Sequence, residues 1–126
     1  MDKQQGLKRV LVAEDEKAYS RALVLKLKHA GFEAQSAGDG EEALAILKGG
    51  SFDLLILDLV MPKLNGFAVL EELQGLGIRL PVIVLSNLMQ DEDKGKAQIL
   101  GAQLFLEKSN SSLVDIISEV KKILSE

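Results

Sequence analysis

The chain has 126 residues, 47% of them hydrophobic, and carries a net charge of −4. A chain of this length forms one domain with a sizeable core. It contains no cysteine, which excludes disulfides, thiolate metal sites and thiol nucleophiles. No apolar run approaches the roughly 18 residues of a membrane span, and the N-terminus lacks the apolar core of a signal peptide. The sequence also has no cluster of basic residues that could bind the phosphate backbone of a nucleic acid. We therefore expect a single cytoplasmic domain with no direct contact to membrane or nucleic acid.

The first part of the chain alternates strand and helix patterns. The apolar run 9–13 predicts a strand, and apolar residues at helical spacing predict a helix over 16–30. A short strand over 32–37 comes next. Asp39 then has the position of an N-cap for a helix over 40–48, whose first turn is acidic. Two strand-helix units are therefore expected before residue 50.

The same alternation continues to the end of the chain. The next elements are strands over 53–58, 81–86 and 103–107, alternating with helices over 66–74 and 91–100. A last helix starts near Ser112, which has the spacing of a capping box with Asp115. Repeated strand-helix units of this length imply an α/β fold, a doubly wound five-stranded parallel sheet with five helices on its two faces.

Polar side chains follow four of the five predicted strands. They are Glu14 and Asp15 after the first strand, Asp58 after the third, Ser86 at the end of the fourth and Lys108 after the fifth. In an open parallel sheet, ligands bind outside the carboxyl ends of the strands. We therefore expect these side chains to form a single site.

The chemistry of this set points to phosphoryl transfer. Two carboxylates such as Asp15 and Asp58, about 4 Å apart, repel by roughly 4 kcal/mol at an effective dielectric constant near 20. A divalent cation removes that cost, and all-oxygen ligands favour Mg²⁺, which accepts phosphate as a co-ligand. Lys108 and Ser86 offer an ammonium and a hydroxyl to phosphoryl oxygens. Asp58 is the expected nucleophile, since the acidic pair after the first strand is better placed to hold metal.

With Met61-Pro62 and Asn65-Gly66 after Asp58, the set resembles the receiver domain of two-component response regulators over essentially the whole chain. The resemblance implies the flavodoxin-like (CheY-like) fold, with residues 1–126 as a single receiver domain and no output domain. It implies that Asp58 accepts a phosphoryl group from a phosphohistidine donor. We also expect Asn65-Gly66 to form a tight turn, which would permit a positive φ.

The resemblance also assigns a metal site. Mg²⁺, or Mn²⁺, would be held by Asp15, Asp58 and the backbone carbonyl of Val60. Glu14 would act on the same ion through water. The chain would then catalyse only its own phosphorylation and slow dephosphorylation, so we expect a signalling domain rather than an enzyme.

A switch and its partners follow from the same resemblance. Ser86 would be the switch hydroxyl and Lys108 the lysine that contacts the phosphoryl group. Phe105 would be the aromatic side chain whose burial follows activation, although an ordinary core role is an equal alternative. The surface of the fourth helix, fifth strand and fifth helix would change shape. The partners implied are a sensor histidine kinase or phosphotransfer protein, and either a downstream protein target or a missing output domain, since a stand-alone receiver and one excised from a longer protein are equally compatible with the sequence. We expect a monomer before phosphorylation, with dimerisation on phosphorylation as an alternative.

Several positions depart from the family pattern. Ser109 follows the lysine where the family usually has a proline after a cis bond, so a trans bond or a strained turn is expected. Asn87 is larger than the usual residue and would narrow the access to Asp58. Val60 and Leu88, which resemble the positions that set phosphoryl lifetime, are both apolar. Since apolar side chains cannot orient an attacking water, we predict slow self-dephosphorylation.

Three other functions are compatible with an α/β domain of this kind. A phosphatase of the haloacid dehalogenase type needs an aspartate two residues after the nucleophile, where this chain has Val60. A flavodoxin-like cofactor binder needs a phosphate loop after the first strand, whereas residues 14–16 are acidic and would repel phosphate. A degenerate receiver that acts only as a constitutive interaction module stays open because of Ser109 and Asn87.

Overall fold

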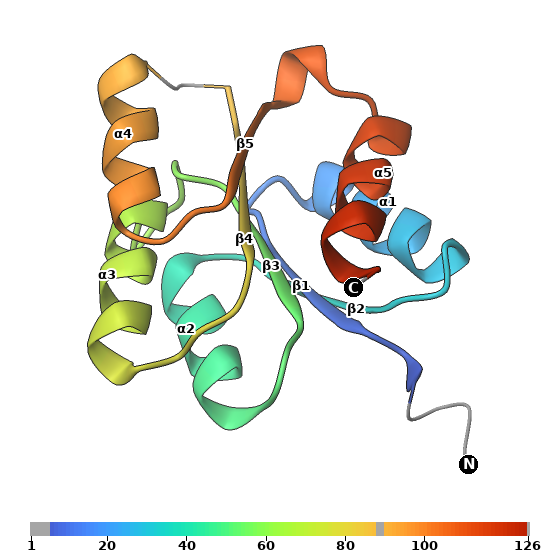
Figure 1. The fold of residues 1–126 in the computed structure, drawn as a ribbon, viewed down its shortest axis with the longest axis horizontal. Coiled ribbons are helices and arrows are strands. Elements are labelled where there is room, and N and C mark those ends of the chain that lie inside the picture. The colour runs from blue at the N-terminus through green and yellow to red at the C-terminus, as the bar shows by residue number, and fades with distance from the viewer. Residues whose placement is uncertain (1–5, 88–89, 126) are drawn as a thin grey trace.

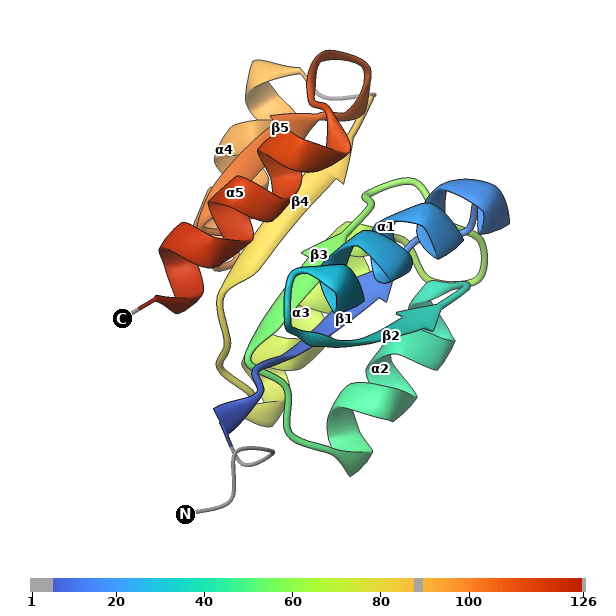
Figure 2. The same cartoon turned by 90° about the vertical axis from the view of Figure 1, so that its right-hand side faces the viewer.

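The computed structural model describes residues 6–87 and 90–125, which form a parallel sheet between two layers of helices (Figures 1 and 2). The strands are β1 (Arg9–Ala13), β2 (Glu33–Ala37), β3 (Leu54–Leu57), β4 (Val82–Ser86) and β5 (Leu104–Glu107). The α-helices are α1 (Lys17–His29), α2 (Gly40–Gly49), α3 (Gly66–Leu76), α4 (Asp91–Ile99) and α5 (Leu113–Leu124). A short 3-10 helix, η2 (Lys108–Asn110), joins β5 to α5. These bounds agree with the predicted elements to within two residues at each end.

The strand order is β2-β1-β3-β4-β5, and all neighbouring strands are parallel. The predicted doubly wound fold is therefore confirmed. Helices α1 and α5 cover one face of the sheet, and α2, α3 and α4 cover the other (Figure 1). Strands β1 and β3 are neighbours, with Ala13 opposite Leu57. The residues that follow these two strands consequently emerge side by side at one edge of the sheet.

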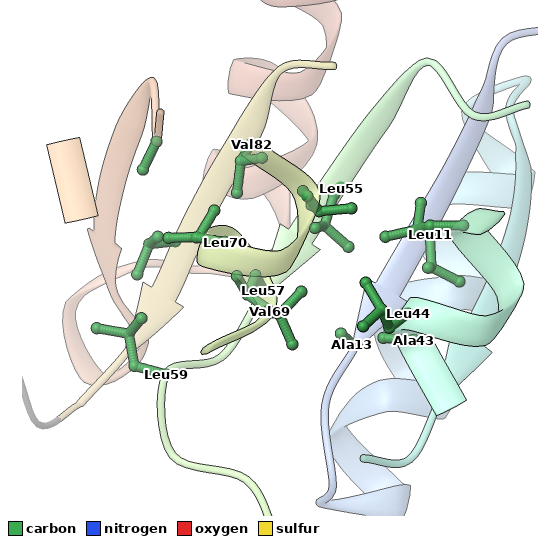
Figure 3. Close-up of a cluster of buried hydrophobic side chains, with 14 of the residues drawn as sticks. Leu11, Ala13, Ala43, Leu44, Leu55, Leu57, Leu59, Val69, Leu70 and Val82 are labelled. Carbon is green, nitrogen blue, oxygen red and sulfur yellow. The ribbon is translucent and has the colours of Figure 1, made fainter. Parts of the chain in front are cut away.

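The core is divided by the sheet into two apolar clusters. On β1, Leu11 faces the cluster under α2 and α3 (Figure 3). Val10 and Val12 face the cluster under α1 and α5. This alternation follows from the two-residue period of a strand. Strands β3 and β4 are buried along their whole length, while the edge strand β2 is mostly exposed. The continuous apolar runs in the sequence thus correspond to the strands buried on both faces.

The helix starts agree with the predicted caps. The Asp39 carboxylate accepts a hydrogen bond from the backbone N–H of Glu42 at 2.8 Å. The Ser112 hydroxyl accepts one from the N–H of Asp115 at 3.0 Å, and the Asp115 carboxylate accepts one from the N–H of Ser112 at 3.1 Å. The predicted N-cap and capping box are therefore confirmed. In the described part of the chain, none of the helices combines the length and apolarity needed to cross a membrane.

Gly66 does not use the positive φ that the expected turn would permit. In the loop before α3, the positive φ belongs to Lys63, at 68°. Gly66 is needed for a different reason, since a Cβ there would lie 2.6 Å from the carbonyl oxygen of Asp58 and 2.7 Å from Cα of Leu59. The start of α3 is therefore packed directly against the backbone at the end of β3.

Candidate functional site

Three carboxylates gather at the carboxyl ends of β1 and β3. Glu14 follows β1 and is 4% exposed, and Asp58 follows β3 and is 6% exposed. Asp15 is exposed beside them. One carboxylate oxygen from each of these residues lies within 4.8 Å of the other two. The pairing of β1 with β3 thus brings together acids that are far apart in the sequence.

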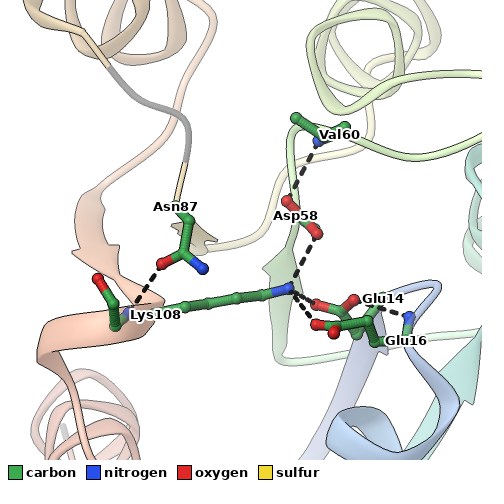
Figure 4. A network of polar contacts seen from close by, with 7 residues as sticks. Glu14, Glu16, Asp58, Val60, Asn87 and Lys108 are labelled. Atoms are coloured by element: carbon green, nitrogen blue, oxygen red, sulfur yellow. Dashed lines mark hydrogen bonds and ion pairs between the residues drawn. The ribbon is translucent and has the colours of Figure 1, made fainter.

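The Lys108 ammonium contacts two of these acids, Glu14 and Asp58, and the neighbouring Glu16 (Figure 4). Its Nζ atom is 2.6 Å from Oε1 of Glu14, 3.1 Å from Oδ2 of Asp58 and 3.2 Å from Oε1 of Glu16. Lys108 begins η2 directly after β5, so its side chain reaches to the ends of β1 and β3 from the far side of β4. The lysine therefore supplies the positive charge around which the carboxylates are held.

Burial and charge set the protonation of this network. Burial raises the pKa of Glu14, and the hydrogen bond from Lys108 only partly opposes that rise. For Lys108, burial disfavours the ammonium, but the hydrogen bond to Glu14 and the charge of Asp58 outweigh it and raise its pKa. The lysine consequently stays charged at neutral pH.

The Asp58 carboxylate is fixed by two contacts on different oxygens. Its Oδ1 atom accepts a hydrogen bond from the backbone N–H of Val60 at 3.1 Å. Its Oδ2 atom accepts one from Nζ of Lys108 at 3.1 Å. Because each oxygen has its own donor, the orientation of the carboxylate is set by the loop after β3 and by the lysine.

The backbone after Lys108 has no proline and is fixed instead by a hydrogen bond to a neighbouring loop. The peptide bonds of the described residues are all trans, which includes the bond between Lys108 and Ser109. The backbone N–H of Ser109 donates a hydrogen bond to Oδ1 of Asn87 at 2.8 Å (Figure 4). Asn87 is exposed and follows β4 directly. The two departures from the family pattern, Ser109 and Asn87, therefore contact one another, and a narrowed access to Asp58 stays a prediction.

The remaining predicted residues lie around this centre. Ser86 ends β4, the strand next to β3, and is 1% exposed. Phe105 on β5 is half-buried against the cluster on the α2, α3 and α4 side of the sheet. Leu88 lies outside the described residues. The structure thus brings together Glu14, Asp15, Asp58 and Lys108, with Ser86 at the end of the neighbouring strand.

The family model of the response regulator receiver domain matches residues 10–121. This chain belongs to that family. The receiver domain is 35% identical over 100 residues to the transcriptional regulatory protein DltR of Streptococcus agalactiae, covering 79% of this chain and 45% of that protein. It is 32% identical over 117 residues to the alkaline phosphatase synthesis transcriptional regulatory protein PhoP of Bacillus subtilis, covering 93% of this chain and 48% of that protein. It therefore spans about half the length of these two relatives.

Solved structures show the same likeness. The receiver domain of the Francisella response regulator 1452 has a TM-score of 0.86 and 32% identity, covering 92% of this chain and 95% of that one. The response regulator TrrA from Thermotoga maritima, in complex with Mg²⁺-BeF, has a TM-score of 0.81 and 30% identity, covering 94% of this chain and 100% of that one. The predicted family and fold of this receiver domain are therefore confirmed.

The acidic cluster of this receiver domain suits a divalent cation. Glu14, Asp15 and Asp58 offer oxygen ligands only, which is the donor set of Mg²⁺ and Mn²⁺. A cation that binds one or two protein carboxylates usually keeps several waters, and the exposed Asp15 leaves the cluster open to them. The residues present therefore fit the metal expected from the sequence.

Two neighbours of Lys108 were missed from the sequence. Glu16 contacts its ammonium through an exposed carboxylate, and the ring centroid of Tyr19 lies 5.0 Å from Nζ. From its spacing in the sequence, Tyr19 fits only the apolar face of the helix predicted over 16–30. Glu16 could have been found from its place in the acidic run after the first strand, because ligand sites of such sheets lie at the carboxyl ends of the strands.

Proposed function

We propose that this chain is a single phosphoacceptor domain that takes a phosphoryl group onto Asp58 from a phosphohistidine. The observation that carries the proposal is the 3.1 Å contact between Nζ of Lys108 and Oδ2 of Asp58 inside an acidic cluster. A carboxylate held in this way can act as the nucleophile, while the ammonium is placed to meet phosphoryl oxygens. The donor would be a sensor histidine kinase or a phosphotransfer protein.

The transfer is an in-line displacement at phosphorus. A carboxylate oxygen of Asp58 forms the new O–P bond, and the P–N bond of the phosphohistidine breaks. The imidazole nitrogen leaves with the electron pair of that bond, and Asp58 becomes an acyl phosphate. Lys108 would pass from the carboxylate to a phosphoryl oxygen, since both lie within reach of one flexible ammonium.

The metal site of the proposal uses four groups. Asp15, Asp58 and the carbonyl of Val60 would bind Mg²⁺ or Mn²⁺, with Glu14 acting through water. Once bound, the ion would supply positive charge against the carboxylates and the phosphoryl oxygens. The support for this arrangement is the close approach of the Glu14, Asp15 and Asp58 oxygens, within 4.8 Å of one another.

Phosphorylation would then change the surface formed by α4, β5 and α5. Ser86, buried at the end of β4, would donate its hydroxyl to the phosphoryl group, and Phe105 would move inward. Two observations support a mobile response on this side. Phe105 is only half-buried, and Ala97 is the one buried residue of α4. A downstream protein that prefers one state of this surface would be controlled by the population shift.

The test is the mass of the intact protein after incubation with Mg²⁺ and acetyl phosphate. We expect one phosphoryl adduct on the wild type, and none on Asp58→Asn or in the presence of EDTA. An adduct that persists in Asp58→Asn would contradict the assignment of the acceptor. Absence of any adduct on the wild type, with this donor and with phosphoramidate, would reject the function itself.

A further inference from the structure

The exposed Glu16 carboxylate is held at the entrance of the site. Its Oε1 atom lies 3.2 Å from Nζ of Lys108, although 68% of its side chain is exposed. Its backbone N–H donates to Oε2 of Glu14 at 2.8 Å, which fixes the chain at this point. Glu16 also occupies the N-cap of α1, but its side chain makes no capping hydrogen bond. The carboxylate is therefore directed to the lysine rather than to the helix.

Glu16 also disturbs the balance of charge. The carboxylates of Glu14, Asp15 and Asp58 would be neutralised together by one divalent cation and the Lys108 ammonium. Glu16 adds a further negative charge, and among residues 6–87 and 90–125 it forms an ion pair only with Lys108. It consequently shares that ammonium with any phosphoryl group that enters the site. An incoming donor meets one unmatched negative charge beside its binding position.

We propose that Glu16 is a specificity-determining residue that selects phosphodonors by their charge. The proposal rests on phosphoryl transfer to Asp58 being the function of this site. A negative charge at the entrance repels a donor in proportion to the negative charge which that donor carries. Glu16 therefore disfavours acyl phosphates, which are dianions at neutral pH. It favours donors with a nitrogen-bound phosphoryl group, in which protonation of the nitrogen lowers the net negative charge.

Two small donors separate these classes. Acetyl phosphate is a dianion at neutral pH, and phosphoramidate carries one negative charge less because its nitrogen is protonated. In both reactions Asp58 gains an O–P bond. The P–O bond to acetate or the P–N bond to ammonia breaks, and the leaving group takes the electron pair. The initial rate of adduct formation with each donor, at saturating Mg²⁺, gives a rate ratio that cancels a general loss of activity.

In Glu16→Gln we expect the ratio of the acetyl phosphate rate to the phosphoramidate rate to rise about threefold, the effect of one unit charge a few ångströms away in water. Glu16→Asp, which keeps the charge, should retain the wild-type ratio. Glu71→Gln removes another exposed glutamate, on α3, and should also leave the ratio unchanged. Raising the salt concentration should reduce the difference between wild type and Glu16→Gln, because exposed charges are screened.

A second measurement needs no donor. Without the Glu16 carboxylate, the Lys108 ammonium pairs only with the carboxylates that would bind the metal. The site also loses one negative charge that attracts cations. We therefore expect Mg²⁺ affinity, measured by calorimetry, to fall about three- to tenfold in Glu16→Gln and to stay unchanged in Glu71→Gln. If Glu16→Gln is phosphorylated normally with an unchanged donor ratio, the proposed role of Glu16 is overturned, while the phosphoacceptor function stands. An unchanged Mg²⁺ affinity in Glu16→Gln would also overturn the proposed role of Glu16. A wild type that forms no adduct with either donor would reject the function on which it rests.

Discussion

Lys108 and Asp58 stand 50 residues apart in the sequence, yet Nζ of the lysine lies 3.1 Å from Oδ2 of the aspartate. Strand β4 lies between β5, which leads to Lys108, and β3, which leads to Asp58. The lysine side chain must therefore cross the end of β4 (Figure 4). This contact thus ties the end of β5 to the end of β3 across β4, and it links the stability of this part of the sheet to the chemistry of the site.

Replacement of Lys108 by methionine should destabilise the metal-free protein by about 3 kcal/mol at neutral pH, since breaking a buried ion pair leaves uncompensated charge. The Glu14 and Asp58 side chains are almost wholly buried and would lose their common ammonium. Urea denaturation in EDTA measures the change. Adding Mg²⁺ should restore much of the loss by stabilising the folded state that binds it.

The matched variants for this prediction are Lys108→Arg and the double variant Lys108→Met/Glu14→Gln. Arginine keeps a positive charge and should cost less than methionine. In the double variant one of the stranded carboxylates is gone, so its free energy of unfolding should exceed that of Lys108→Met. If Lys108→Met is as stable as the wild type in EDTA, the ammonium does not hold the carboxylates together.

Gly66→Ala should destabilise the protein, because its Cβ would lie 2.6 Å from the Asp58 carbonyl oxygen, which is backbone and cannot move alone. We expect a loss of about 1–3 kcal/mol, as for other overpacked sites, together with weaker phosphorylation of Asp58. Gly75→Ala is the control in the same helix, since its Cβ would meet nothing within 4 Å. An equal effect of both substitutions on thermal unfolding would contradict the close-contact explanation.

The sequence was sufficient to predict the fold and the centre of the site for one physical reason. Buried parallel strands are nearly pure apolar runs, so the polar residues that interrupt them at their carboxyl ends stand out. Parallel pairing then brings those ends together, as for Glu14 and Asp58. The N-cap role of Asp39 could also be predicted from the sequence, because a cap interacts only with residues two or three positions away.

What could not be predicted depends on contacts between distant segments. Gly66 was assigned to a turn, whereas its role comes from the approach of α3 to the end of β3. The hydrogen bond between Asn87 and Ser109 joins two loops that have no common sequence pattern. Glu16 is one more exposed acid until η2 brings Lys108 to it. Such pairs are fixed by tertiary packing rather than by local periodicity.

Asn87→Ala should cost about 1 kcal/mol of stability, because it removes the acceptor for the Ser109 N–H, which lies 2.8 Å from Oδ1. The decisive comparison is with Ser109→Pro, which has no N–H to donate. Adding Asn87→Ala to Ser109→Pro should therefore produce little further loss in urea denaturation. Additive losses in this cycle would show that Asn87 stabilises the protein through some other contact.

Gly95→Ala should stabilise the protein by about 0.5–1 kcal/mol, the usual difference between glycine and alanine inside a helix. Gly95 lies in the middle of α4, and a Cβ there would meet nothing within 4 Å. Hydrogen exchange of the α4 amides should slow in parallel with the rise in melting temperature. A loss of stability would mean that α4 needs the freedom of this glycine.

Val60→Asn should shorten the lifetime of the phosphorylated state several-fold. Val60 is 52% exposed, and its backbone N–H donates to Oδ1 of Asp58, so the residue stands beside the acceptor. Valine offers no group that orients an attacking water, whereas an amide can donate to it and accept from it. The decay of the adduct after removal of the donor, followed by intact mass, measures the effect. Val114→Asn makes the same change at a valine on α5 that is 65% exposed, and it should leave the decay unchanged. Equal decay of wild type and Val60→Asn would contradict this explanation, because the residue at position 60 would then not control the attack of water on the phosphoryl group.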